Sequence, residues 1–305
     1  MATYDTNVRR AFSSQETLIN RAEHCSADAE QLATIGRGHG HQIRVWRNGS
    51  EDVALYTVSE FRQETPETIV RMARVARARL TPEEVETPDE FAAIVDSQVP
   101  HPTYTDDEAE ANGEFVERLT DDGAHTGLVA IAPHGGAIER WTDQQAERVA
   151  SQLADKGVSC WRCKGYSQGG EAFGQWHITA AEIAPASFPL LDSIIHRGFT
   201  YAVAFHGFSQ CRILIGGGAS YALKQEIQVA IQAAVLGSGI AVDIATAADN
   251  FNGDNPNNIV NRLANGNGIQ IEQSKEARDN YWQEIADAVQ GVYNCKIELP
   301  QAAEC

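Results

Sequence analysis

The fold of this chain is decided by residues 127–157, which read GLVAIAPHGGAIERWTDQQAERVASQLADKG. The stretch begins with an unbroken apolar run, Leu128–Ala132, which is typical of a strand buried on both faces. Thr142 then begins a helical pattern, with Gln145 three residues later as in a capping box, and Gly157 ends it. A buried strand followed by a helix is the repeating unit of an α/β domain.

The same alternation continues towards the C-terminus. We expect strands at Val158–Lys164, Thr200–Phe205, Ile213–Ile215, Ile240–Ala245 and Ile269–Glu272. We expect helices at Phe188–Arg197, Tyr221–Leu236, Asn257–Leu263 and Glu276–Val289. This order predicts an α/β domain with a largely parallel sheet that is covered by helices on both faces.

Residues 1–100 follow a different pattern and predict a smaller α+β domain. Gln42–Arg47 and Val53–Val58 are short β-like runs, and Asn48-Gly49-Ser50 between them suits a hairpin turn. Pro66–Leu80 carries its apolar residues along one helical stripe, so a helix is expected there.

A stretch rich in acidic residues and proline separates the two patterns. We therefore expect an acidic junction at residues 101–125 and the α/β domain at residues 126–305. Acid-rich segments are usually just solvated, and we assign this one no function.

Composition excludes several classes of function. The formal net charge of -18 argues against nucleic-acid binding, because contact with phosphates needs a basic surface. No apolar run is long enough to span a membrane, so we expect no membrane partner. The first twenty or so residues lack the layout of a signal peptide. We expect a protein of the cytoplasm or one released by lysis, or a secreted one if a leader has been removed.

The six cysteines are spread along the chain, unlike the dense framework of small disulfide-rich domains. Cys160 and Cys163 form a Cys-x-x-Cys pair, but no second pair is present to complete a structural zinc site. Ordinary packing cysteines are favoured over a metal or redox role, and the sequence leaves open whether the two form a disulfide.

Three side chains able to bind metal follow or end expected strands. His134 comes just after Leu128–Ala132, His206 directly follows Thr200–Phe205, and Glu272 ends Ile269–Glu272. In open α/β sheets, ligands bind beyond the carboxyl ends of the strands. We therefore expect these three side chains to meet at one edge of the sheet.

A catalytic zinc commonly takes two histidines and one glutamate and leaves a fourth position for water. Gly135 and Gly136 would let the chain turn sharply, so that Glu139 can reach the metal of His134, with His206 as the third ligand. Glu272 would then be the general base. Each residue by itself has an ordinary alternative, a hydrogen-bonded histidine or a solvated acid, so the hypothesis depends on their combination.

Four segments in order resemble the bacteriophage poly-γ-glutamate hydrolase family. They are His134-Gly135-Gly136-Ala137-Ile138-Glu139, His177-Ile178-Thr179, Phe205-His206-Gly207 and Gly268-Ile269-Gln270-Ile271-Glu272. The resemblance runs from about Gly127 to Val292. It implies a three-layer α/β sandwich with a mainly parallel, mixed sheet related to zinc carboxypeptidases. It also implies one catalytic Zn2+ and cleavage of glutamyl amide bonds.

By motif position, the resemblance implies that His134, Glu139 and His206 bind the metal and that Glu272 is the catalytic carboxylate. It suggests a contact of His177 with the substrate or the transition state, and a hydrogen bond within a loop is an equal alternative. Arg262 and, more weakly, Arg212 are candidates for binding a substrate carboxylate, with an ordinary helix-surface arginine as the alternative for Arg262.

The leading hypothesis is thus a zinc-dependent hydrolase of poly-γ-glutamate or a related amide. One alternative is a zinc deacylase of small N-acyl amino acids, and another is a non-catalytic binding protein that acts through the N-terminal domain. That domain has no counterpart in the small phage enzymes and is a candidate for homo-oligomerisation. The negative net charge is unfavourable for attracting a polyglutamate chain.

Overall fold

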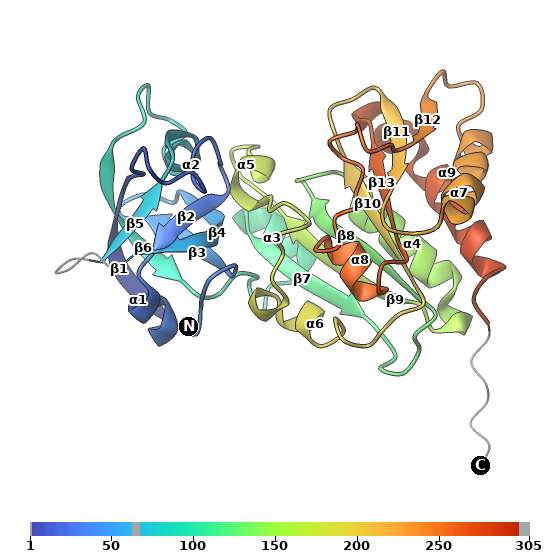
Figure 1. Ribbon diagram of the computed structural model, residues 1–305, viewed down its shortest axis with the longest axis horizontal. Helices are drawn as coiled ribbons and strands as arrows, with labels where there is room; N and C mark the ends of the chain where they lie inside the picture. Colours follow the sequence, from blue (N-terminus) through green and yellow to red (C-terminus); the bar gives the residue numbers. More distant parts are fainter. Residues whose placement is uncertain (1, 63–67, 299–305) are drawn as a thin grey trace, which may run out of the picture. The chain divides into compact units, whose positions relative to one another are not determined.

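The structure is a computed structural model that describes residues 2–62 and 68–298 (Figure 1). It divides into two compact units. The first comprises Met1–Phe115 and Tyr166–Pro189, and the second comprises Val116–Gly165 and Leu190–Cys305. A segment from the middle of the chain therefore belongs to the first unit, although the sequence on both of its sides belongs to the second.

The first unit is built on a closed six-stranded barrel, which corrects the expected α+β arrangement. The strands are β1 (Thr3–Arg10), β2 (His24–Ala27), β3 (Gln42–Arg47), β4 (Val53–Phe61), β5 (Ile69–Met72) and β6 (Glu90–Asp96). They follow the order β1-β5-β2-β4-β3-β6 around the barrel. Val8, Val45, Tyr56 and Val70 are among the buried side chains that fill its core. Closure gives each of the six strands a neighbouring strand on both sides.

The predicted hairpin is confirmed, because β3 and β4 pair in antiparallel fashion across the turn at Gly49, whose φ is 80°. The helix expected at Pro66–Leu80 is wrong for its first half. Ile69–Met72 is a strand, and helix is limited to α2 (Arg74–Arg77) and a 3-10 turn at Ala78–Leu80. β5 pairs with β1 on one side and β2 on the other, which outweighs the local helical pattern. Pro66 lies outside the described residues.

Three more helices belong to the first unit, namely α1 (Ala29–Thr34), α3 (Asp106–Asn112) and α5 (Ala172–Trp176). A 3-10 turn at Pro185–Ser187 follows. α3 begins at a capping box formed by Thr105 and Glu108 and ends at Gly113 in the left-handed conformation. Acidic residues of the expected junction fill the first turn of α3, where negative charge favours a helix.

The predicted mixed sheet of the second unit is confirmed, and it has seven strands, of which Phe115–Thr120 was not expected. Its strands are β7 (Phe115–Thr120), β8 (Leu128–Gly136), β9 (Ser159–Gly165), β10 (Tyr201–Gly207), β11 (Arg212–Gly216), β12 (Ala241–Ile244) and β13 (Gly268–Gln273). Their order is β12-β11-β13-β10-β8-β9-β7. Strands β13, β10, β8 and β9 are parallel, whereas β11 runs antiparallel to β13 and parallel to β12.

Helices pack against this sheet. They are α4 (Thr142–Gln152), α6 (Pro189–Asp192), α7 (Tyr221–Ala234), α8 (Ile259–Leu263) and α9 (Lys275–Asn294), with a 3-10 turn at Ala154–Lys156. Buried side chains of α4, α7 and α9 share one hydrophobic core with the strands. α8 packs against β10 and β13, and in Figure 1 it lies on the side of the sheet away from α7 and α9.

Two local predictions in this unit need correction. No capping box forms at Thr142, because the N-cap is Trp141, and Thr142 Oγ1 instead donates to the carbonyl of Glu139 at 2.8 Å. The helix expected at Phe188–Arg197 is only Pro189–Asp192. After it the chain continues in turns whose hydrogen bonds mostly join residues three apart.

Cys160 and Cys163 lie on β9, and both are buried free thiols, as packing cysteines are. Burial raises the pKa of Cys160 to about 11 and raises that of Cys163 as well, so neither thiol is poised to react.

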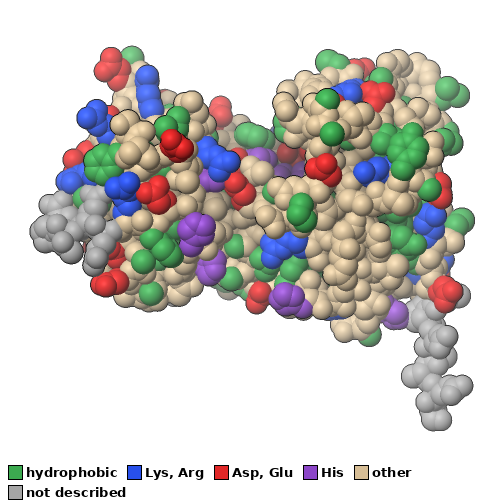
Figure 2. All heavy atoms as spheres, in the orientation of Figure 1, with side chains coloured by type: hydrophobic (Ala, Val, Ile, Leu, Met, Phe, Trp, Pro, Cys, Tyr) green, Lys and Arg blue, Asp and Glu red, His purple; other side chains and the backbone are tan. Residues whose placement is uncertain are grey.

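On the face in view in Figure 2, basic side chains are interspersed among the acidic ones in both units. In the part of the chain that the structure describes, no helix is both long and apolar enough to cross a bilayer.

Candidate metal centre

Three adjacent parallel strands of the second unit carry the predicted site residues at their carboxyl ends. His134 lies on β8, His206 on β10 and Glu272 on β13. Because β10 lies between β8 and β13, these strands end at the same edge of the sheet, and His206 is the direct register partner of Glu272. All three side chains are buried, with exposures of 3–5%. Polar groups buried to this degree need partners.

The end of β8 is shaped so that His134 and Glu139 face each other. The register with β9 shifts between Ala132 and Gly135, which re-aims the intervening side chains. Gly136 then takes a φ of 68°, and Glu139 N donates to the carbonyl of His134 at 2.8 Å. A Cβ at Gly135 would lie 2.5 Å from the Cβ of Asp143 and 2.7 Å from the carbonyl oxygen of Cys163. Only glycine fits there.

A buried ion pair of Asp143 and Lys164 holds the turn that follows β8 in place. Asp143 accepts a hydrogen bond from Gly136 N at 3.2 Å, and its other oxygen lies 3.2 Å from Lys164 Nζ. Lys164 also binds Glu147 at 2.9 Å. The turn that presents Glu139 is thus anchored to both β9 and α4.

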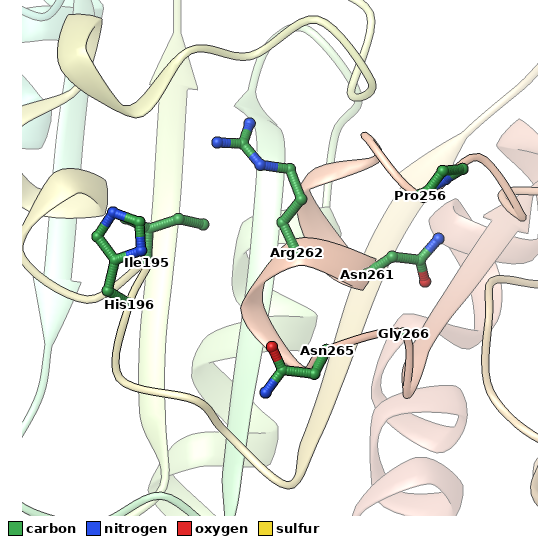
Figure 3. A pocket seen from close by; sticks show the side chains of 7 residues that line it. All are labelled: Ile195, His196, Pro256, Asn261, Arg262, Asn265 and Gly266. Atoms are coloured by element: carbon green, nitrogen blue, oxygen red, sulfur yellow. The ribbon is translucent and has the colours of Figure 1, made fainter.

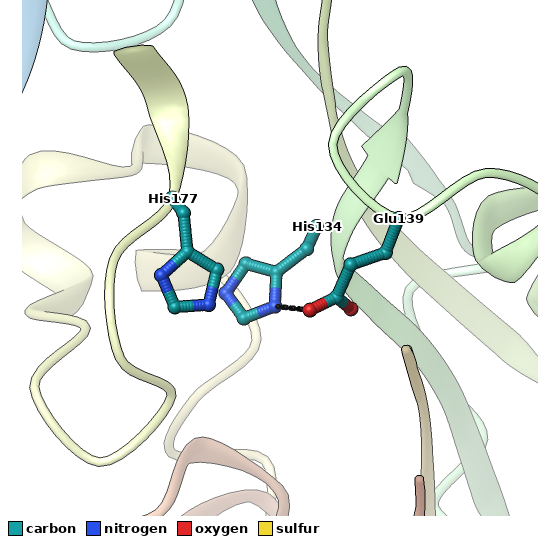
Figure 4. Close-up of side chains that lie close together, drawn as sticks. All are labelled: His134, Glu139 and His177. Carbon is teal, nitrogen blue, oxygen red and sulfur yellow. Dashed lines mark ion pairs between the residues drawn. The ribbon is translucent and has the colours of Figure 1, made fainter. Parts of the chain in front are cut away.

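The donor atoms of His134, Glu139 and His206 converge. Nδ1 of His206 lies 3.2 Å from Nδ1 of His134, which in turn lies 3.3 Å from Oε1 of Glu139. Oε2 of Glu139 lies 3.5 Å from His206 Nδ1 and accepts a hydrogen bond from Gly207 N at 2.9 Å. Figure 4 shows the ion pair of His134 and Glu139.

These spacings fit a single cation. Zinc binds imidazole nitrogen and carboxylate oxygen at about 2.0–2.2 Å, so tetrahedral ligand atoms lie about 3.3–3.6 Å apart. The separations of 3.2, 3.3 and 3.5 Å in the structure are close to this range. Two imidazoles and one carboxylate are also a ligand set that catalytic zinc uses.

The pKa values of Glu139 and Glu272 are shifted in opposite directions. Burial alone would raise the pKa of Glu139, but the charge and hydrogen bonds of His134 and His206 outweigh it and hold that pKa well below its usual range. Burial, reinforced by the negative charge of Glu139, raises the pKa of Glu272 well above normal. Such a divergence is typical of sites where one carboxylate binds a charge and the other exchanges a proton.

Arg278 also belongs to this candidate site, although no sequence motif pointed to it. It lies on α9, is 9% exposed, and donates from Nη1 to the carbonyl of Arg140 at 2.7 Å. Its positive charge favours the ionised forms of Glu139 and Glu272. Helical periodicity gave no signal for it, because Tyr281, with non-helical φ and ψ of -136° and 16°, interrupts α9 between Arg278 and the buried Ile285.

His177 belongs to the first unit, at the C-terminal end of α5. Its Nδ1 pairs closely with Glu23, and its ring stacks on Phe173 with centroids 4.3 Å apart. Glu23 also accepts a hydrogen bond from Thr179 N at 2.8 Å. The orientation of the imidazole is therefore fixed, and its contact with a substrate stays a prediction.

Arg262 lies on α8 and lines a pocket of about 430 Å³ together with His196, Asn265 and other residues (Figure 3). Burial lowers the pKa of Arg262. Figure 3 shows the side chains of Arg262 and His196 facing this space from two different segments. The pocket is thus suited to an anion, and binding of a substrate carboxylate there stays a prediction.

The guanidinium of Arg212 is already engaged by two carboxylates, since Asp249 lies 2.7 Å and Asp243 3.2 Å from its nitrogens. A substrate carboxylate would have to displace one of them, and this role also stays a prediction.

Comparison with known proteins identifies the family. The profile described as "Poly-gamma-glutamate hydrolase" matches residues 106–293. The SPbeta prophage-derived UPF0714 protein YoqZ of Bacillus subtilis (strain 168) is 25% identical over 151 residues, 50% of this chain and 50% of that protein. The chain therefore spans about half the length of the curated relative that it matches.

Two solved structures are similar to this chain. One is described as bacteriophage poly-gamma-glutamate hydrolase, with 25% identity, a TM-score of 0.44 and coverage of 58% of this chain and 88% of that one. The other, "YNDL-apo (Zinc-free)", has 21% identity, a TM-score of 0.46 and coverage of 62% and 95%. Because the family profile matches more than half of its residues, the chain belongs to the poly-gamma-glutamate hydrolase family.

Proposed function

We propose that this protein is a zinc-dependent hydrolase of γ-glutamyl amide bonds. His134, Glu139 and His206 hold the metal, and Glu272 is the general base. The observation that carries the proposal is the convergence of three ligand residues beside a buried carboxylate: the two imidazole Nδ1 atoms lie 3.2 Å apart, and the two Glu139 oxygens lie 3.3 and 3.5 Å from His134 and His206, respectively. Membership of the family supports the substrate class.

When bound, zinc would polarise the scissile carbonyl and lower the pKa of the attacking water. Glu272 has the properties that the accompanying proton transfer needs. Its Oε1 accepts a hydrogen bond from Gln270 at 2.9 Å, and we assign to Oε2 the transfer of the proton of the water. A carboxyl group whose pKa is raised holds that proton more readily than an exposed glutamate and can pass it to the departing amine.

We assign substrate recognition to positively charged or neutral donors outside the metal cluster. Arg262, with His196 across the same pocket, would bind a glutamyl carboxylate through its two parallel N–H groups. His177, whose Nδ1 is held by Glu23, would donate from its other ring nitrogen to the substrate. We leave Arg212 out of this set, because Asp243 and Asp249 already neutralise it.

The test begins with the metal. Purified protein should contain close to one zinc per chain, and a chelator should remove both the zinc and the hydrolysis of poly-γ-glutamate. Glu272→Gln should keep the zinc and lose about 10²–10⁴-fold in kcat. Glu276→Gln is the matched control, because Glu276 is an exposed acid on the next helix and its loss should leave turnover unchanged.

Two outcomes would overturn the proposal. One is a protein that binds no divalent metal, and the other is a Glu272→Gln variant that hydrolyses as fast as the parent. If small N-acyl glutamates are hydrolysed and the polymer is not, the zinc chemistry stands, but the enzyme is a deacylase of small substrates. If the polymer is bound but neither substrate is hydrolysed, a non-catalytic binding role replaces the enzyme.

A further inference from the structure

A hydrogen-bonded chain of amides leads to the proposed general base. Gln270 and Glu272 are two residues apart on β13, so their side chains lie on the same face of the sheet. Gln270 Nε2 donates to Glu272 Oε1 at 2.9 Å and more weakly to the carbonyl of Phe251 at 3.4 Å. Both side chains are buried. This amide is the donor that holds one oxygen of the carboxylate.

Asn258 sets the polarity of this amide. Its Nδ2 donates to Gln270 Oε1 at 2.6 Å, so the oxygen of the Gln270 amide must face Asn258 and the nitrogen must face Glu272. The orientation of Asn258 is fixed in turn, because its Oδ1 accepts a hydrogen bond from Val260 N at 3.2 Å as the N-cap of α8. The orientation of both amide groups is therefore fixed, and each hydrogen bond in this series runs in one direction.

We propose that Asn258 and Gln270 are positioning residues for catalysis, which hold the Glu272 carboxylate in one orientation, with Oε1 bound to Gln270 and Oε2 turned to exchange a proton with water. The inference rests on the proposed function, in which Glu272 is the base. Neither residue touches the reacting atoms. Each acts by limiting the rotation of a carboxylate whose misplacement by about 1 Å would cost about 10²-fold in rate.

The same series of hydrogen bonds links the proposed base to a residue proposed to bind the substrate. Asn258 caps the helix that carries Arg262, and it is buried at the start of that helix. A shift of α8 would therefore move the donor of Gln270 as well as the guanidinium of Arg262. One short helix thus positions both a proposed substrate ligand and the support of the proposed base.

Two substitutions test the inference. Gln270→Leu keeps the size of the side chain and removes the donor to Glu272. Asn258→Asp keeps an oxygen to cap α8 but accepts from Gln270 instead of donating to it, so the amide of Gln270 turns its oxygen towards Glu272. We expect each variant to lose about 10–100-fold in kcat on poly-γ-glutamate, with KM and zinc content close to those of the parent.

A double-mutant cycle separates positioning from a general loss of structure. In a Glu272→Gln background, Gln270→Leu should change kcat little, because the base that it supports is already gone. Gln145→Leu is the control. It breaks a buried amide pair with Gln273, whose two hydrogen bonds are both 2.8 Å, without touching the Glu272 side chain. Its effect on kcat should be the same in both backgrounds.

The inference fails if Gln270→Leu lowers kcat equally in both backgrounds, or if Gln270→Leu and Asn258→Asp both turn over like the parent. If Gln270→Leu does not fold, Asn258→Asp in the same cycle decides the question. Failure of the proposed function looks different. In that case the parent lacks zinc, or Glu272→Gln by itself has no effect.

Discussion

Gly207 N donates to Glu139 and its Cα faces Arg278, so an alanine at this position should disturb the proposed metal centre without removing any polar group. A Cβ at Gly207 would lie 2.5 Å from Cζ of Arg278 and 2.7 Å from its Nε and Nη2. Ordinary contacts are about 3.5–4.0 Å, so the guanidinium has to retreat by about 1 Å. It is the end of a flexible side chain and therefore moves before the backbone does.

The cost of Gly207→Ala follows from what Arg278 then loses. Its Nη1 donates to the carbonyl of Arg140 at 2.7 Å, and a retreat of about 1 Å stretches this contact beyond hydrogen-bonding distance. A hydrogen bond from a charged group contributes about 1.5–3 kcal/mol, and overpacking a buried site costs about 1–3 kcal/mol. We expect the free energy of unfolding to fall by about 2.5–6 kcal/mol, the sum of these two costs, and zinc affinity to fall about 10–100-fold.

The assay compares the parent, Gly207→Ala, Arg278→Ala and the double variant by urea unfolding and by zinc competition with a chromophoric chelator. The double variant should resemble Arg278→Ala, since the added methyl group then has nothing to displace. Gly291→Ala is the control, because no atom lies within 4 Å of the new Cβ on α9, and it should be stabilising by up to about 1 kcal/mol. Additive losses in the double variant would refute the reasoning.

Two further predictions concern the first unit and the pocket. Burial would raise the pKa of Glu23, but His177 and Arg79 outweigh it and lower that pKa from 4.5 to about 2. The resulting stabilisation is present above pH 4.5 and is lost as the pH falls through 2. Between pH 5 and pH 2 the parent should therefore lose about 3 kcal/mol of unfolding free energy through this group, and Glu23→Gln should not show this part of the loss. Chemical denaturation at both values checks this, and identical pH dependence in the two proteins would contradict it. Arg262→Gln should raise KM for glutamyl substrates about 10–100-fold with kcat nearly unchanged, because it removes a charge-assisted pair made equally in ground and transition states. Steady-state kinetics on parent and variant measure both constants, and an unchanged KM would exclude Arg262 from recognition.

Much of the second unit could be predicted from local patterns. The apolar runs at β8, β10 and β13 are strands, and the position of His134, His206 and Glu272 at or just beyond their ends follows from the order of residues alone. Since parallel neighbouring strands end at a common edge, sequence order was enough to expect these side chains to meet.

The first unit shows where local patterns fail. Ile69–Met72 has spacing that suits a helix, yet it is a strand because β1 and β2 offer hydrogen-bonding partners on its two sides. Neither partner is near it in sequence. The closed barrel could not be predicted for the same reason, because closure depends on pairing between strands and not on any single strand.

The order of residues along the chain was enough to predict the alternation of strands and helices in the second unit, to propose a set of metal-binding side chains and to place the chain in its family. Three features became visible only in the folded chain: Gly207 leaves room for Arg278, Asn258 and Gln270 support Glu272, and residues 166–189 pack with the first unit. The difference lies in how far apart along the sequence the interacting residues are. Periodicity and caps arise from neighbours a few residues apart, whereas the contacts that orient a catalytic group join segments whose proximity exists only after folding.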